Sequence, residues 1–235
     1  TMFIEYTRRN GLALSLTNVL GALALVYAAW HEGAEGVDTM QPLVAVLDTN
    51  FWLSTHVTTV SMGYCAGLLA AVMGNVYIFS KLWNLSVRDT SRHVGRKFYA
   101  DLAKMTYGVI CFGVLFSTVG TILGGVWAED SWGRFWGWDP KENGALMVVL
   151  GFLAMIHARM GGHLREHGIA VASVVMGIIV MWSFLGVNLY AIGLHSYGFD
   201  ETKYVVTQIY YWTQWSVVVL GILAWSVPRL KQPSG

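Results

Sequence analysis

Residues 105–128, MTYGVICFGVLFSTVGTILGGVWA, contain no Asp, Glu, Lys or Arg. A helix needs about 20 consecutive apolar residues to cross the hydrocarbon core of a bilayer, and this run is long enough. Five further uncharged runs lie at 10–31, 49–80, 143–158, 168–199 and 204–228. The run at 143–158 is short and needs residues 140–142 or 160–162 to reach spanning length. The sequence therefore predicts an all-α integral membrane protein with six transmembrane helices.

The composition supports the same class. The chain has 235 residues, of which 55% are hydrophobic and 12% charged, whereas a soluble domain carries about 25% charge. We predict one transmembrane domain over residues 1–235 and no separate soluble domain. Arg8 and Arg9 before an apolar run also fit a cleaved signal peptide, but the run has spanning length, which favours a retained helix. The chain opens with Thr1, so it fits either a processed protein or the carboxy-terminal part of a larger or fused one.

The basic residues are distributed unevenly between the predicted loops. Only three of the fifteen Lys and Arg residues fall on one side of the membrane: Arg134, Lys141 and Lys203. The other twelve fall on the opposite side. The positive-inside rule then places both termini in the cytoplasm and the loop between the third and fourth helices outside. The net charge of +1 gives no indication of a nucleic-acid partner, and the composition indicates the lipid bilayer instead.

The outer loop, WGRFWGWDPKENG at residues 132–144, is rich in tryptophan. Four of the chain's eleven tryptophans fall within twelve residues: Trp127, Trp132, Trp136 and Trp138. An aromatic belt at the membrane surface explains one or two of them but not this density. Trp132 and Trp136 would share a face of a short helix, and Gly133 and Gly137 would let a flat ligand approach the backbone. The loop therefore predicts a platform for a planar aromatic molecule.

The polar end of the loop has a local explanation. In D-P-K-E, Asp139 fits the N-cap of the fourth helix, Pro140 fits its first position, and Glu142 can reach back to the cap. We predict that this motif starts the helix and fixes the platform to it. A contact between Asp139 and the ligand stays open beside the capping role.

Two histidines lie within apolar runs near the outer ends of predicted helices. His56 lies in NFWLSTHVTTVSMGY, residues 50–64, and His195 in GVNLYAIGLHSYGF, residues 186–199. Ionisable side chains in membrane helices usually mark a functional site. Either histidine alone could be a buried hydrogen-bonding residue, but their shared side favours a ligand pair. Two neutral imidazoles can bind haem iron from opposite sides, so we predict that His56 and His195 ligate haem iron and that the tryptophans hold the porphyrin.

The remaining histidines and the cysteines carry weaker signals. His157, toward the cytoplasmic end of the fourth helix, could bind the same cargo at another depth or lie beside Arg159. We expect four histidines to be solvated loop residues: His31, His93, His163 and His167. The chain has no CxxC or CxxCH, and Cys65 and Cys111 are expected to be packing residues within helices.

These motifs resemble a known family. W-G-x-x-W-x-W-D-P-K-E at 132–142 resembles the tryptophan-rich (WWD) signature of the haem-handling proteins of cytochrome c biogenesis. Three stretches resemble their CcsA (ResC-type) branch, which works in the system II, CcsBA-like pathway: MQPLVAVLDTNFWLSTHVTTVSMGY at 40–64, IHARMGG at 156–162 and GLHSYGF at 193–199. The resemblance runs from about residue 40 to residue 226.

The resemblance implies roles for individual residues. His56 and His195 match the two extracytoplasmic histidines that hold the iron of haem b beside the tryptophan loop, and His157 matches a transmembrane haem ligand. The family's second transmembrane histidine belongs to a CcsB/ResB-like component. No counterpart is expected here, because the remaining histidines are assigned to loops. The chain would then be one subunit, or the carboxy-terminal part, of a CcsBA-like protein.

The implied function is haem delivery for cytochrome c maturation. With the CcsB-like partner the protein would be a cytochrome c synthase (haem lyase), presenting haem for thioether attachment to the CxxCH of apocytochrome c. No general base is predicted. The alternatives are a haem exporter without ligation activity and a membrane b-type haem electron carrier or quinone oxidoreductase; a permease unrelated to haem would leave the tryptophan loop unexplained. The expected location is the cytoplasmic membrane of a bacterium with the active face outside, and a thylakoid membrane fits equally.

Overall fold

The computed structural model describes residues 11–35, 51–87, 91, 93–189 and 201–230. Every regular element within these ranges is a helix, which confirms the predicted all-α class. The chain divides into two compact units, residues 1–48 and 49–235. The first unit contains helix α2 (Leu12–Glu35). His31 therefore lies within a helix and not at the start of a loop as predicted, because the helix continues through HEGAE.

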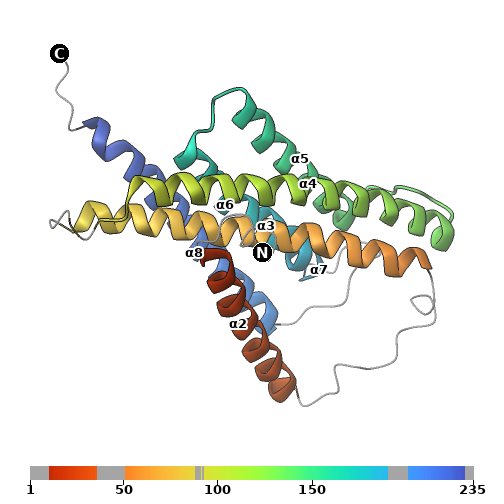
Figure 1. The fold of residues 1–235 in the computed structure, drawn as a ribbon. Helices are drawn as coiled ribbons and strands as arrows, with labels where there is room; N and C mark the ends of the chain where they lie inside the picture. The colour runs from red at the N-terminus through yellow and green to blue at the C-terminus, as the bar shows by residue number, and fades with distance from the viewer. Residues whose placement is uncertain (1–10, 36–50, 88–90, 92, 190–200, 231–235) are drawn as a thin grey trace. The chain divides into compact units, whose positions relative to one another are not determined.

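The second unit is a bundle of long helices (Figure 1). Its elements are α3 (Phe51–Ser86), α4 (Arg96–Trp132), α5 (Pro140–Met160), α6 (Glu166–Met181), the π-helix η3 (Trp182–Gly186), α7 (Val187–Leu189) and α8 (Glu201–Leu230). The fourth helix takes in residues 140–142 and ends at Met160, so the short apolar run reaches spanning length as predicted.

Helices α3 and α4 lie side by side and antiparallel (Figure 1). Small residues let their backbones approach closely. A Cβ at Gly120 would lie 2.7 Å from the backbone of Val60, and one at Gly63 would meet the Ser117 side chain. Membrane helices associate through such small-residue contacts, because lipid gives no hydrophobic drive between helices.

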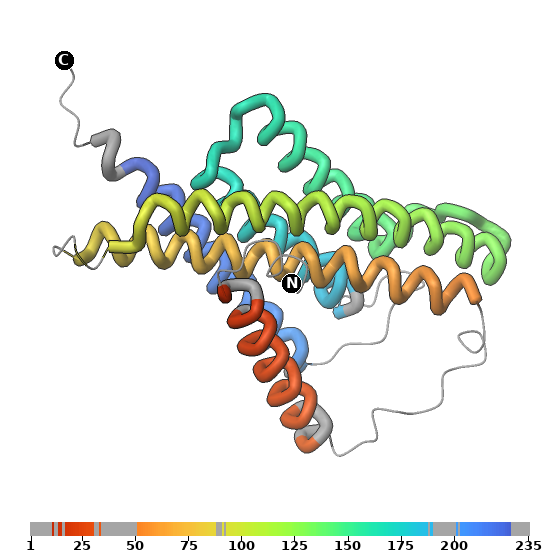
Figure 2. Tube along the Cα trace, viewed as in Figure 1, coloured from red at the N-terminus to blue at the C-terminus, as the bar shows by residue number. Residues whose placement is uncertain are grey.

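The remaining helices also alternate in direction, as the trace in Figure 2 shows. A Cβ at Gly67 of α3 would lie 2.6 Å from the Val180 side chain of α6, and one at Gly221 of α8 would lie 3.0 Å from Ile78 of α3. The amino-terminal ends of α3, α5 and α8 therefore share one end of the bundle with the carboxy-terminal ends of α4 and α6. We call this end of the bundle the tryptophan end.

Four helical stretches are long and apolar enough to cross a membrane: 51–86, 96–132, 140–160 and 166–186. The protein is therefore an integral membrane protein. Helix α2 contains a shorter apolar stretch, Thr17–Trp30, and α8 covers the sixth predicted run. Six spans stay a prediction.

The fifth predicted run is not one continuous α-helix. Helix α6 ends at Met181 and passes into the π-helix η3 and the short α7. A π-helix is uncommon and is often found at functional sites. Ser183 within it is fully buried, and a Cβ at Gly186 would lie 2.8 Å from the Tyr211 hydroxyl of α8, so this segment is tightly packed.

Candidate functional site

His56 lies in the second turn of α3, at the tryptophan end. Its Nδ1 lies 2.7 Å from the carbonyl oxygen of Gly120 on α4. A carbonyl oxygen can only accept, so Nδ1 carries the proton and Nε2 carries the lone pair. Metal-binding histidines are commonly oriented in this way, by donation from the second ring nitrogen. The His56 tautomer therefore suits ligation of iron through Nε2.

The His56 ring is held between a glycine and a tryptophan. A Cβ at Gly124 would lie 2.7 Å from the ring Cε1, so only glycine leaves the ring this place. The buried Trp127 ring is nearly parallel to the imidazole, with an interplanar angle of 7° and centroids 6.2 Å apart. Trp127 was counted among the tryptophans predicted to hold the porphyrin, but its contact with His56 and the places of Gly120 and Gly124 were not predicted. Gly120 and Gly124 precede Trp127 by seven and three residues, a spacing that places all three on one face of a helix. This spacing was the available signal in the sequence.

The tryptophan loop begins where α4 ends. Gly133 terminates α4 with φ 68°, in the left-handed region, where glycine is favoured. Trp132 is the last helical residue and Trp136 lies beyond the helix, so the prediction that they share a helix face is wrong. Instead Trp132 packs edge-on against Trp127, with centroids 4.7 Å apart.

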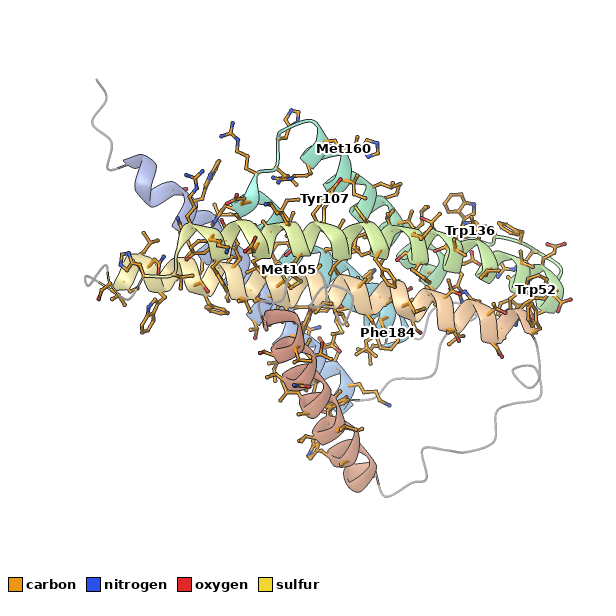
Figure 3. All side chains as sticks on the ribbon, in the orientation of Figure 1. Trp52, Met105, Tyr107, Trp136, Met160 and Phe184 are labelled. Atoms are coloured by element: carbon orange, nitrogen blue, oxygen red, sulfur yellow. The ribbon has the colours of Figure 1, made fainter. Side chains whose placement is uncertain are left out.

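A second aromatic pair lies farther along the loop. The Trp136 and Trp138 rings are 6.0 Å apart and nearly perpendicular, and Trp138 is 70% exposed. The Arg134 guanidinium lies over Gly137, in the space that a Cβ there would take. Gly133 and Gly137 thus each have a structural explanation, and their contact with a ligand stays a prediction. Figure 3 shows Trp136 and Trp52 of α3 toward the same end of the α3–α4 pair.

The predicted capping box at the start of α5 is confirmed. The Asp139 carboxylate accepts from the Lys141 backbone N–H at 2.9 Å, and Asp139 is buried. The Glu142 carboxylate accepts from the backbone N–H groups of Asp139 at 3.0 Å and of Gly137 at 2.8 Å. The motif therefore ties the loop to α5.

Lys141 and Tyr64 connect this region to the π-helix. The Lys141 ammonium donates to the backbone carbonyl of Phe184 at 2.8 Å and lies 5.6 Å from the centre of the Phe184 ring. The Tyr64 hydroxyl of α3 forms a 2.8 Å hydrogen bond with Ser183. These bonds fix the π-helix, and with it α7, at the tryptophan end. His195, which follows α7 in the chain, lies outside the described residues.

His157 lies in the last turn of α5, far from His56. Its side chain is exposed and its Nδ1 lies 2.7 Å from the Leu153 carbonyl oxygen, so Nε2 again carries the lone pair. Figure 3 shows Met160, three residues further on, away from Trp136. His56 and His157 are therefore not part of one site.

The other described histidines on the opposite side differ in their exposure to solvent. His163 is exposed, as predicted. His93 is half-buried, with Nε2 2.8 Å from the Val87 carbonyl oxygen. His167 lies within α6, half-buried, with Nε2 2.8 Å from the Gly221 carbonyl oxygen and its ring edge-on to Tyr77. His93 lies in the connection between α3 and α4, so its loop assignment is right, but it is half-buried and not fully solvated. The loop assignment is wrong for His167, because α6 begins at Glu166.

Two further observations concern metal and thiol chemistry. Cys65 and Cys111 are free and exposed on the outer faces of helices, so the prediction that they are packing residues is wrong. In the part of the chain that the structure describes, no three His, Cys, Asp or Glu side chains gather as a metal site. Haem iron needs only axial ligands from the protein, and the tautomer of His56 suits such a ligand.

The comparisons with known proteins agree with the resemblance. Residues 5–195 match the cytochrome C assembly protein family. The chain belongs to this family. Among its relatives, the cytochrome c biogenesis protein CcsA of Chlamydomonas reinhardtii is 34% identical over 158 residues, or 67% of the chain and 43% of the relative. The CcsA protein of Solanum tuberosum is 31% identical over 223 residues, or 83% of the chain and 70% of the relative.

A cyanobacterial relative gives a similar match. The CcsA protein of Prochlorococcus marinus (strain NATL1A) is 28% identical over 222 residues, covering 84% of the chain and 70% of the relative. The match to the Chlamydomonas protein spans less than half of that protein's length, and the match to CcsA of Cuscuta reflexa spans 54% of it. The chain is thus a CcsA-type member of the cytochrome c assembly family.

Proposed function

We propose that this protein delivers haem for cytochrome c maturation and presents it at the tryptophan end for attachment. The observation that carries the proposal is the His56 ring. It is packed against Gly124 and Trp127, and its Nδ1–H donates to the Gly120 carbonyl 2.7 Å away. This arrangement leaves the lone pair of Nε2 for iron and gives the ring little freedom to rotate.

His195 is proposed as the second iron ligand. Six positions along the chain separate it from Leu189 and six from Glu201, and both of these residues lie at the tryptophan end. The hydrogen bonds of Tyr64 and Lys141 to η3 would support the segment that carries it. Trp132, Trp136, Trp138, Gly133, Gly137 and Asp139 are proposed to border the haem b ring.

The loop also provides positive charge for the haem carboxylates. Arg134 is half-buried over Gly137, between the Trp132 and Trp136 positions. A guanidinium in this place can form paired hydrogen bonds with a carboxylate. This role of Arg134 was not predictable from the sequence, since one arginine in an outer loop has no distinctive pattern.

The protein's contribution to attachment would be position. Bound haem would supply the vinyl groups to which the cysteine thiols of a CxxCH segment add. Holding the two reactants in register is worth several kcal/mol of the barrier. The exposure of Trp138 would let it contact an incoming apocytochrome. We assign no general base, since Asp139 and Glu142 are occupied in the capping box.

His157 is proposed to hold haem at an inner site with a CcsB-like partner. Its exposed position near the end of α5 fits a ligand that is completed by another chain. The expected location is the cytoplasmic membrane of a bacterium with the tryptophan end outside, and a thylakoid membrane is the alternative.

The test is the absorption spectrum of the detergent-purified protein co-expressed with its partner, oxidised and then reduced with dithionite. We expect a low-spin haem spectrum that is lost or becomes high-spin in His56→Ala/His195→Ala. His163→Ala, which changes an exposed histidine, is the matched control and should keep the spectrum. A wild-type protein without haem would refute the proposal.

Synthesis and export are separated by a second experiment. The protein reconstituted with only its partner, haem and an apocytochrome should form covalent haem that resists acid–acetone extraction. Haem release without thioether formation would identify an exporter. Quinol-linked reduction of the haem without a maturation defect in the double variant would identify an electron carrier.

A further inference from the structure

A pocket of about 480 Å³ lies between α5, α6 and α8. It is lined by Met147, Ile178, Ile179, Trp182, Gln208, Tyr211, Trp212 and Trp215. None of these residues belongs to the proposed haem site. The volume lies in the range of pockets for small organic ligands.

Three indole rings and a phenol surround this pocket, and it opens to the outer face of the helices. Trp212 is 72% exposed and Trp215 48% exposed. In a membrane protein such a face meets lipid, so a ligand would arrive through the bilayer. Flat conjugated rings pack favourably against indole faces and edges.

Gln208 is the polar group that an aromatic belt does not explain. It lies in the uncharged run 204–228 and lines the pocket, half-buried. Within the described residues its amide forms no hydrogen bond. If the predicted sixth span lies in the bilayer, an amide there that lacks a partner costs free energy, and a ligand oxygen or N–H would offset that cost.

The lining also limits the charge of the ligand. The eight residues include no Lys, Arg or His, so an anionic head group or a dianionic porphyrin would find no counter-charge among them. A neutral molecule fits better. Trp182 belongs to η3, and the π-turn helps to form one wall of the pocket.

We propose that this pocket binds a lipid-soluble molecule with a neutral, flat, oxygen-bearing ring, which is the chemistry of a membrane quinone. The ring packs among Trp182, Trp212 and Trp215, and the Gln208 amide donates to a ring oxygen. Met147 and Ile178 border the apolar substituents.

The experiment uses the full chain with its co-purifying partners in nanodiscs of phosphatidylcholine that contain no quinone. A short-chain ubiquinone analogue is titrated while tryptophan fluorescence is followed. We expect saturable quenching, and a Kd about threefold to tenfold higher in Gln208→Leu, since one hydrogen bond is lost. Thr213→Val is the control, because Thr213 lies on α8 outside the lining, is exposed, and bonds the Ile209 carbonyl at 2.7 Å; its Kd should be unchanged.

A second measurement uses only the wild-type protein, so its result does not depend on whether a variant folds. Wild-type protein is irradiated with an azido-quinone, and the labelled peptide is identified by mass spectrometry. Label on residues 208–215, removed by excess unlabelled quinone, supports the proposal. Two results would overturn the proposal: non-saturating quenching that is equal in wild type and Gln208→Leu, or label outside residues 208–215. Displacement of the quinone by haemin with the same dependence on Gln208 would also overturn it, because it would assign the pocket to a porphyrin.

Discussion

At the scale of single residues, the glycines of α4 have two tasks. Gly120 packs against Val60, and its carbonyl also fixes the tautomer of His56. Gly124 leaves room for the same imidazole. Close helix packing and ligand orientation therefore depend on the same small side chains, so a methyl group added here disturbs both.

Gly124→Ala tests this dependence. The new methyl would lie 2.7 Å from the His56 Cε1 and 2.8 Å from its Nδ1, so the ring must shift from its present position. We expect a destabilisation of about 1–3 kcal/mol, measured as a lower midpoint of thermal unfolding in detergent, together with weaker haem retention. Gly108→Ala on the same helix, where nothing lies within 4 Å of the new Cβ, should be neutral or slightly stabilising. Equal effects of the two changes would contradict the role of Gly124.

Glu142→Ala tests the capping box. Its carboxylate accepts from two loop N–H groups, those of Gly137 and Asp139. Leaving such donors without partners costs about 1–3 kcal/mol, so we expect a clear fall in the thermal midpoint and faster proteolysis within residues 133–139. Glu129→Ala, at an exposed position near the end of α4, should change neither. An unchanged loop in Glu142→Ala would show that the cap does not fix it.

Side-chain placements could be predicted from the sequence where the residues that determine them are close together in the chain. The D-P-K-E capping box is encoded within four residues, so it was predictable. The placement of Arg134 over Gly137 and of Lys141 against Phe184 depends on loop conformation and on a helix more than forty residues away. The outward direction of Cys65 and Cys111 was also not predictable, since both faces of a membrane helix are apolar.

At the scale of elements, the π-helix η3 is bonded to both α3 and α5, through Tyr64 and Lys141. The presence and order of the helices in the described part of the chain were predictable from the apolar runs. Their bounds were not, since α4 begins at Arg96, before its uncharged run at 105–128, and α3 continues to Ser86, past its run at 49–80. The π-turn was not predictable either, because WSFLG carries no helix-breaking residue before its glycine. The end of α4 at Trp132 depends on the left-handed Gly133. The φ angle of Gly133 ends the helix before Trp136. The four-residue spacing of Trp132 and Trp136 would otherwise place both on one helix face.

The Tyr64–Ser183 hydrogen bond provides a test of this link. Both side chains are buried and their oxygens are 2.8 Å apart. Tyr64→Phe and Ser183→Ala should each destabilise the protein by about 1–2 kcal/mol, because each leaves a buried hydroxyl or its site unpaired. The double variant should cost less than the sum, with a coupling of at least 0.5 kcal/mol, measured by denaturant unfolding. Strictly additive losses would mean that this bond does not hold η3.

At the scale of the whole molecule, the alternating helices bring charges together as the positive-inside rule requires. Lys81, Arg96 and Arg165 lie at one end of the bundle, and Arg134 and Lys141 lie at the other, with Trp132, Trp136 and Trp138. This agreement joins a pattern in the sequence to an arrangement in space. The orientation in which the protein is inserted into the membrane sets which end faces the cytoplasm. This orientation decides whether haem presented at the tryptophan end can meet an extracytoplasmic apocytochrome.

Cysteine labelling in intact cells tests that orientation. In a background with Cys65 and Cys111 replaced by Ala, Glu129→Cys places a thiol at the tryptophan end and His163→Cys at the opposite end, and both positions are exposed. With twelve of the fifteen Lys and Arg residues on the predicted cytoplasmic side, we expect a membrane-impermeant maleimide to label Glu129→Cys in intact cells. His163→Cys should react only after the membrane is permeabilised. The reverse pattern would place the tryptophan loop in the cytoplasm, where haem held by His56 could not reach an exported CxxCH segment, and the proposed attachment function would fail with it.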